Sequence, residues 1–362
     1  MSKKAFEPPN YLFSAYFSNL PERSYCISVS KQNVTSKNEG RDYEDFNGIV
    51  AESLISWVNC CVENPEKMLS EIAENFGFRK DLVQALLAKN LSEYVDFDTE
   101  LGLLLPAVRV DGLEVQISPV YFLIKKHLIV SIHGRNVTRF VQFFKYAETF
   151  VKKIPKNTPA EDRLTLILIR LLDKNNEKNF ENLRYIEEEG DKINALLIDP
   201  NSPRSKIGTE MYKMKHALIS YLGALWGSLD VVNSLRYGDS ELITDNPHIL
   251  KNFSLLAKEI TTQISISEHM SEVLASGLEV LQSIYNNQLQ ILNNRLSLLV
   301  TWLSILGTAI VIPNTLGTIF GIPAISDMMD ANTIILVLVV STIVSAIAAY
   351  LVVKKFLPRQ MD

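Results

Sequence analysis

One face of a single helix near the C-terminal end of the chain carries side chains that could bind a hydrated cation. Small hydroxyl residues recur there in steps of four and three, the spacing that keeps side chains on one helical face. The positions are Ser297, Thr301, Ser304, Thr308, Val311, Thr315 and Thr318, and Asn314 adds an amide beside the C-terminal half. Hydroxyl and amide groups can hydrogen-bond the water shell of an ion without removing it, and Mg²⁺ gives up its waters reluctantly. The pattern therefore indicates conduction of a hydrated divalent cation, with Val311 and its isoleucine neighbours as an apolar constriction.

The same residues have a second interpretation. Small Ser and Thr side chains also let membrane helices pack closely, and any one of these positions taken alone fits that role better. The register as a whole favours a pore. Two membrane helices in one chain cannot enclose a pore, so a pore requires several copies around a shared axis. Pro313 leaves one carbonyl without its helical partner, which either faces the pore or bends the helix.

Two stretches without charged residues, 296–326 and 331–353, predict membrane-spanning helices near 298–320 and 333–353. A helix needs about 20 apolar residues to cross a bilayer, and soluble core helices rarely lack charge for so long. The second stretch is rich in Ile, Leu and Val, with Ser341, Thr342 and Ser345 as its polar interruptions. We therefore expect the second span to face lipid.

The flanking charges predict the orientation of both spans. The basic flanking residues are Arg295, Lys354, Lys355 and Arg359. The loop 321–332 between the spans has Asp327 and Asp330 and no Lys or Arg. By the positive-inside rule both termini lie in the cytoplasm, as expected for a multi-pass protein of the plasma membrane. The two aspartates would then concentrate cations at the outer mouth. The N-terminal residues show no signal-like apolar segment.

The sequence as a whole predicts an α+β membrane protein. The predicted parts are a loosely ordered lead-in (1–45), a cytoplasmic α/β domain (46–157), long cytoplasmic helices (158–245), a stalk helix continuing into the first span (246–320), the loop (321–332), the second span (333–353) and a basic tail (354–362). Strand-like runs occur at 54–61, 102–110, 114–117 and 128–133, and helical runs at 65–76 and 80–87. A capping box at 158–161 opens one helix towards Leu197, which Asp199 and Pro200 stop. A second helix covers about 207–235, and a third begins at Asp-Asn-Pro (245–247), a capping residue next to a proline.

The predicted stalk helix carries an apolar seam in steps of mostly four and three. Its members are Ile249, Phe253, Leu256, Ile260, Ile266, Met270, Val273, Gly277, Val280 and Ile284. Such a long helix needs neighbours. The seam fits an intramolecular hairpin and contacts between subunits equally well.

Composition excludes several other classes of function. The net charge of −5 argues against a nucleic-acid partner. The three cysteines and five scattered histidines provide no disulfide framework and no zinc motif. We find no nucleophile–base pair and no Gly-rich phosphate loop, so the sequence predicts neither an enzyme nor a cofactor other than the transported ion.

With these features the chain resembles the CorA family of divalent-cation transporters, and the resemblance extends from about Trp57 to Leu357. The resemblance rests on the run 122–133, on 212–235 with Leu-Gly-Ala-Leu-Trp at 222–226, on Asn-Arg-Leu-Ser at 294–297, and on two C-terminal spans with a short loop. It implies a funnel-shaped homopentamer in a lipid membrane, with five first spans around the pore. Passive flux of a divalent cation, Mg²⁺ first, is the function implied. Transport of Zn²⁺, Co²⁺ or Ni²⁺, export, and a non-conducting scaffold or sensor on the same fold are the alternatives.

The chain departs from the family's Gly-Met-Asn signature. Gly321, Ile322 and Pro323 occupy that place. Because proline has no side-chain donor or acceptor, ion capture would use backbone carbonyls, Asn314, Thr318 or the loop aspartates. Ser297 replaces a second family asparagine, and Val300 stands where a methionine is frequent.

The family also binds regulatory magnesium through acidic side chains of its cytoplasmic part. Glu259, Glu187 and Glu188, with the adjacent Glu189, are the candidates here. A charge run is more often a solvated helix face. Neither span contains a thiol or an imidazole, which disfavours selectivity for soft metals by direct coordination.

Overall fold

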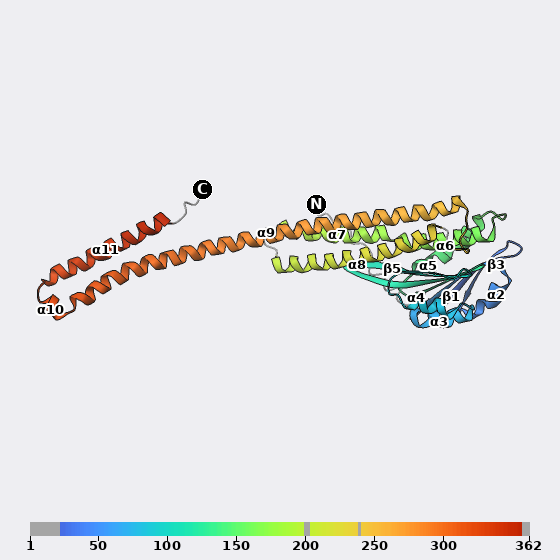
Figure 1. Cartoon of the computed structure of the whole chain (residues 1–362), viewed down its shortest axis with the longest axis horizontal. Coiled ribbons are helices and arrows are strands. Elements are labelled where there is room, and N and C mark those ends of the chain that lie inside the picture. The colour runs from blue at the N-terminus through green and yellow to red at the C-terminus, as the bar shows by residue number, and fades with distance from the viewer. Residues whose placement is uncertain (1–21, 199–202, 238–239, 357–362) are drawn as a thin grey trace, which may run out of the picture. The chain divides into compact units, whose positions relative to one another are not determined.

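The computed structural model describes residues 22–198, 203–237 and 240–356, and it divides into a unit ending at Leu278 and a unit beginning at Glu279. A seven-stranded sheet of order β2-β1-β3-β7-β6-β5-β4 forms the centre of the first unit (Figure 1). The strands are β1 (Arg23–Ser30), β2 (Thr35–Gly40), β3 (Ser53–Val62), β4 (Glu93–Asp96), β5 (Glu100–Asp111), β6 (Glu114–Lys125) and β7 (Leu128–Gly134). All neighbouring strands pair antiparallel except β3 and β7, which pair parallel. The predicted α+β class is confirmed.

Helices cover both faces of this sheet because successive side chains of a strand point to opposite faces. On β3, Val58 packs into the core with Leu69 and Leu82, which belong to α3 (Pro65–Asn75) and α4 (Lys80–Leu87). Trp57, on the other face, lies 5.3 Å from Phe143 of α5 (Arg139–Lys153), measured between ring centroids. The short helices η1 (Glu44–Phe46) and α2 (Asn47–Glu52) precede β3.

A buried polar cluster ties β3 to β7 at the centre of the sheet. The indole of Trp57 donates to the Ser131 hydroxyl at 2.9 Å, and Ser131 donates to the side-chain oxygen of Asn59 at 2.7 Å. His133 Nε2 lies 3.1 Å from the same oxygen. Burial lowers the pKa of His133 to about 4, so the imidazole is neutral near pH 7.

Four long helices follow the sheet domain. They are α6 (Ala160–Asn176), α7 (Asn179–Ile198), α8 (Arg204–Arg236) and α9 (Pro247–Phe320). Asn246 accepts a hydrogen bond from the backbone N–H of His248 at 3.1 Å, and its own amide donates to Asp162 of α6 at 3.2 Å. This contact caps the predicted start of α9 and attaches it to α6.

The prediction of a loosely ordered lead-in over 1–45 is wrong from Arg23 onward. Residues 23–40 form β1 and β2, and residues 1–21 lie outside the described part. Tyr25, Ile27 and Val29 are buried on one face of β1. These strands were not predicted because the composition of the segment is polar. Strand β2 is an edge strand of polar residues, held by backbone pairing with β1.

The prediction of one helix from 158 to Leu197 is also wrong, since α6 ends at Asn176 and α7 begins at Asn179. The side chain of Asn175 donates to the carbonyl of Pro106 at 2.9 Å, and its backbone carbonyl accepts from the guanidinium of Arg139. These contacts fix the end of α6 and compete with helix propagation. Helix α5 and strand β4 were not predicted, and the third predicted strand run ended at 117, whereas β6 continues to Lys125. The helix stop predicted at 199–200 lies outside the described residues.

The apolar seam of α9 divides along its length. Ile249, Phe253, Leu256 and Ile260 are buried as predicted. Further along, Met270 is also buried as predicted, but Ile264 and Leu274 are buried outside the predicted seam, whereas Ile266, Val273 and Val280 are 37%, 45% and 50% exposed. A second apolar row at seven-residue spacing therefore remains open in the single chain.

The second unit contains the end of α9, the short helix α10 (Pro323–Ser326) and α11 (Ala331–Phe356). Both α9 and α11 contain stretches long and apolar enough to cross a membrane, with mean hydropathy of 2.0 and 2.7. Those stretches bury almost nothing within the chain, which distinguishes them from the core helices of a soluble protein. Of the predicted basic tail, residues 357–362 lie outside the described part.

Candidate functional site

The hydroxyl register predicted on α9 lies on an open helix face. Side chains of Ser297, Ser304, Thr308, Val311, Asn314, Thr315 and Thr318 are exposed, and Thr301 is half-buried. A different side of α9, which includes Ile305, Ala309 and Leu316, is half-buried within the unit. On that side Gly317 lies close to α11, because a Cβ at Gly317 would meet Leu338 at 3.8 Å. The register is therefore available to another copy or to a water-filled space.

Four hydroxyls of the register donate to the backbone carbonyl four residues earlier. Ser304 donates to Val300 and Thr308 to Ser304, both at 2.9 Å. Thr315 and Thr318 donate at 2.8 Å to Val311 and Asn314. Each hydroxyl has one proton, so these four oxygens present lone pairs to their surroundings. Waters bound to a cation direct their hydrogens outward, and an acceptor surface of this kind fits a hydrated cation.

Helix α9 continues through Pro313 to Phe320. Proline has no N–H, so the carbonyl of Ala309 loses its usual helical donor. Beyond the helix, Gly321 donates to the carbonyl of Gly317 at 3.0 Å, and Pro323 begins α10. Asp327 and Asp330 follow with exposed side chains, and Met328 between them is 84% exposed. The loop thus presents two solvent-accessible carboxylates in the segment that follows the hydroxyl face along the chain.

Helix α11 differs from α9 in where its polar groups point. Ser341 and Thr342 both donate to the carbonyl of Leu338, at 2.8 and 2.7 Å, and Ser345 donates to that of Thr342 at 3.0 Å. Ser345 is buried, whereas large apolar side chains such as Leu336 and Val344 are exposed at 64% and 59%. An apolar exposed surface is what a lipid-facing helix requires.

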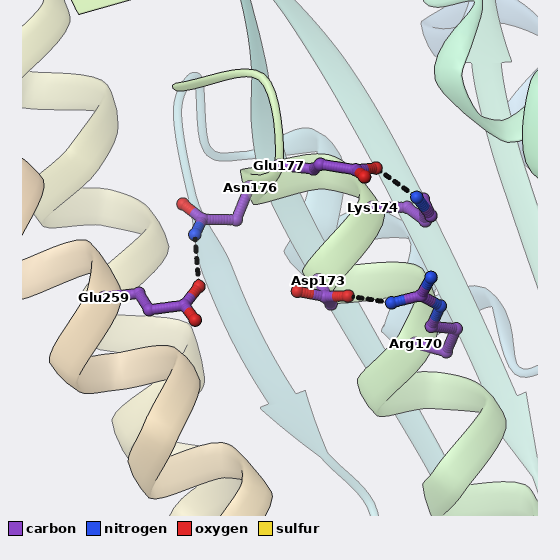
Figure 2. A network of polar contacts seen from close by, with 6 residues as sticks. All are labelled: Arg170, Asp173, Lys174, Asn176, Glu177 and Glu259. Atoms are coloured by element: carbon purple, nitrogen blue, oxygen red, sulfur yellow. Dashed lines mark hydrogen bonds and ion pairs between the residues drawn. The ribbon is translucent and has the colours of Figure 1, made fainter. Parts of the chain in front are cut away.

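The acidic candidates for a regulatory magnesium site lie on two helices. Glu259 of α9 accepts a hydrogen bond from the side chain of Asn176 at 3.5 Å, as Figure 2 shows. Glu188 of α7 pairs with Arg184 at 3.5 Å, and Glu187 is exposed. Within the described residues no three His, Cys, Asp or Glu side chains gather in a group that could hold a metal ion. The structure therefore does not assemble these glutamates into one metal site.

A row of buried side-chain amides next to Glu259, formed by Asn176, Asn179 and Gln263, was not predicted from the sequence. Asn179 donates to the side-chain oxygen of Asn176 at 2.9 Å and lies 3.4 Å from that of Gln263 on α9. Among the described residues, the side-chain oxygen of Asn179 and the side-chain nitrogen of Gln263 have no hydrogen-bond partner. A cavity of about 10 Å³ adjoins Asn179 and is lined also by Asn175, Asn176 and Ser228 among others. Its size suits one water, which would complete the row between the end of α6 and α9.

The surrounding ion pairs hold the end of α6 in place. Lys174 pairs with Glu177, and Arg170 pairs with Asp173 (Figure 2). Arg139 of α5 contacts the same helix end. Its guanidinium donates to the Val108 carbonyl at 2.7 Å and to the Asn175 side chain at 3.1 Å. Burial lowers the pKa of Arg139 to about 10, so the guanidinium stays charged at neutral pH. These contacts connect β5 to the helices that pack on α9.

Fold and sequence together define the class as a membrane protein with an α/β domain, a long helix leading into a first apolar segment, and a second apolar helix. The chain belongs to the CorA family, because the family model described as CorA-like Mg²⁺ transporter protein matches residues 52–355. The predicted resemblance is confirmed at this level.

Solved structures show the same fold at low sequence identity. The CorA magnesium transporter from Methanocaldococcus jannaschii is 16% identical, with a TM-score of 0.62 over 92% of this chain and 98% of that one. The ZntB cytoplasmic domain from Vibrio parahaemolyticus is also 16% identical, with a TM-score of 0.55 over 74% of this chain and 100% of that one. The full-length CmaX protein is 15% identical, with a TM-score of 0.51 over 84% of this chain and 87% of that one. Among curated protein sequences none matches the chain significantly.

Proposed function

We propose that the chain forms a homo-oligomeric, channel-like transporter through which a hydrated divalent cation, Mg²⁺ first, moves down its electrochemical gradient. The observation that carries this proposal is the open row of hydroxyl groups on α9. These hydroxyls donate hydrogen bonds to backbone carbonyls, so their oxygens remain available as acceptors. Such a row interacts with a water shell and leaves the ion's own coordination intact. The M. jannaschii relative is described as a magnesium transporter, which favours Mg²⁺.

Several copies are needed because one chain contributes a single hydroxyl face. Helix α8 carries exposed Tyr212, Ile219 and Trp226 at seven-residue spacing, and α9 carries the exposed row that begins at Ile266 and Val273. Apolar rows of this kind are expected to be buried between copies. Five copies are proposed on the family resemblance. The plasma membrane with cytoplasmic termini is proposed from the basic flanks.

Flux into liposomes containing the purified protein tests this function. A trapped Mg²⁺-sensitive dye should report uptake driven by a Mg²⁺ gradient without any nucleotide. Hexammine cobalt, which resembles hydrated magnesium, should block it. Thr315→Leu together with Thr318→Leu should abolish flux, and Thr342→Leu on α11 is the matched control that should preserve it.

The alternative functions give different results in the same assay. Flux of Zn²⁺, Co²⁺ or Ni²⁺ without flux of Mg²⁺, and without hexammine cobalt block, would replace Mg²⁺ as the substrate. Gradients of opposite sign distinguish uptake from export. Absence of divalent flux in every gradient would exclude a transporter and favour a scaffold or sensor on this fold.

A further inference from the structure

A second feature, unrelated to the membrane helices, is a cavity of about 60 Å³ in the α/β domain. It lies between the turn joining β1 to β2, the end of α5 and the start of α6. One wall is aliphatic, formed by side chains such as Val29 and Ile55, and the other carries Asn33, Lys152, Lys156 and Arg163. A single water needs about 10–15 Å³, so this cavity has room for a group of several atoms.

Arg163 is a charged residue that lines this cavity, and it pairs with no carboxylate among the residues that the structure describes. Its side chain is buried, and it donates to the side-chain oxygen of Asn33 at 2.7 Å. The same guanidinium also donates to the backbone carbonyls of Pro155 and Lys156. Its Nε–H is buried and has no hydrogen-bond partner within the described part of the chain. No carboxylate of the described residues forms an ion pair with it. A buried cation without a counter-charge is costly, and a bound anion would offset that cost.

The neighbouring lysines add to this positive charge. Lys152 is paired with Glu148 at 2.6 Å, and this contact lowers the pKa of the Glu148 carboxyl. The side chain of Lys156 is exposed and forms no ion pair with the described residues. Because the Glu148 carboxylate neutralises Lys152, the positive charges of Arg163 and Lys156 remain at the cavity.

Asn33 attaches the cavity to the first hairpin of the sheet. Its φ of 60° places it in the left-handed region, where asparagine is tolerated better than most residues. Its backbone N–H donates to the carbonyl of Ser30 at 2.8 Å, and its side chain is held by Arg163. Arg163 and Asn33 are therefore held in place before any ligand binds, which lowers the entropy lost on binding.

We propose that this cavity binds a phosphate group. A phosphate near pH 7 carries a charge of about −1.5 to −2, which matches the two uncompensated cations. Arginine and lysine are the side chains that recognise phosphate oxygens, and the aliphatic wall excludes water and strengthens the attraction. The phosphate is either the free inorganic ion or the terminal phosphate of a nucleotide. This site is separate from the proposed transport path and does not depend on it.

Binding is tested with the full-length protein in detergent micelles at fixed ionic strength. Inorganic phosphate and ADP are titrated in parallel by isothermal calorimetry and by the shift in unfolding temperature. Lys156→Glu should weaken binding at least tenfold. Lys153→Glu is the matched control, since Lys153 is exposed and adjacent but does not line the cavity, and it should change the affinity less than twofold. Ile154→Trp should fill the cavity and abolish binding without a change of charge.

Each result bears on the proposal. Binding of phosphate and ADP identifies the free ion as sufficient, and binding of ADP alone identifies a nucleotide as the source. Failure of both ligands to bind overturns the proposal. Equal weakening by Lys156→Glu and Lys153→Glu overturns it as well, because the attraction would then be diffuse. Unchanged phosphate affinity in Ile154→Trp places any binding outside this cavity and has the same consequence.

Discussion

The hydroxyl of Thr315 donates to the backbone carbonyl of Val311 at 2.8 Å, and both side chains lie on the open face of α9. The first residue offers an acceptor oxygen to water, while the second offers a methyl surface one helical turn away. A hydrated ion moving along this face would meet an attractive position followed by an apolar one. Such an alternation fits the proposed path, in which an apolar constriction gates by dewetting.

Replacing Thr315 by Val keeps the shape of the side chain and removes its oxygen. A lost hydrogen bond costs about 0.5–1.5 kcal/mol, and every copy in a ring would lose one, so we expect Mg²⁺ flux to fall at least about tenfold. Thr315→Ser should keep at least half of the flux because it keeps the hydroxyl. Dye-reported uptake in liposomes measures both. Equal flux in the Val and Ser variants would remove Thr315 from the conduction path.

Replacing Val311 by Ser should have the opposite effect. Val311 is 60% exposed on the open face, and a hydroxyl there would favour water in the narrow segment. We expect a higher Mg²⁺ leak at low driving force. Val344→Ser on α11, where Val344 is 59% exposed, is the control for a general effect of polar substitution in a span. A leak that rises equally in both variants would show that Val311 is not a constriction.

The membrane segment was predictable from sequence because its signals are local. Absence of charge over 296–326 and the four-three hydroxyl spacing each depend on neighbouring residues of one helix, and α9 and α11 are found where they were expected. Capping at Asn246 and Pro247 likewise predicted the start of α9.

Long-range contacts explain what the sequence analysis missed. Strand β2 is polar and is recognisable only through its pairing with β1. The contact between Asn176 and Glu259 joins residues 83 positions apart, and that between Arg163 and Asn33 joins residues 130 positions apart. No local pattern marks either pair, so the amide row and the cationic cavity become visible only in the folded domain.

Removal of the Arg139 guanidinium should destabilise the α/β domain strongly. Arg139→Leu would leave the Val108 carbonyl and the Asn175 side chain without their donor in a buried place. We expect a loss of about 3 kcal/mol, in the range for a broken buried charged network. Arg184→Leu is the control, because Arg184 is exposed in a surface pair with Glu188, and it should change stability by less than about 1 kcal/mol. Urea unfolding followed by tryptophan fluorescence measures both, and equal midpoints would contradict the assignment.

Acid should weaken the same domain through His133. Burial holds the pKa of this imidazole at about 4, whereas an unfolded histidine titrates near 6.5. Between these values the unfolded chain binds a proton that the folded chain does not, so stability is lost as the pH falls from about 6.5 to 4. The loss from this group should reach about 3 kcal/mol, and above pH 7 it should vanish.

His133→Gln isolates that contribution, because glutamine can hydrogen-bond near Asn59 without taking up a proton in this range. From pH 7 to 4.5 the unfolding free energy of the wild type should fall relative to that of His133→Gln, since only the wild type loses the His133 contribution. His127→Gln, at an exposed position, should leave the slope of the wild type unchanged. Parallel curves for wild type and His133→Gln would show that His133 does not set the acid sensitivity of the domain.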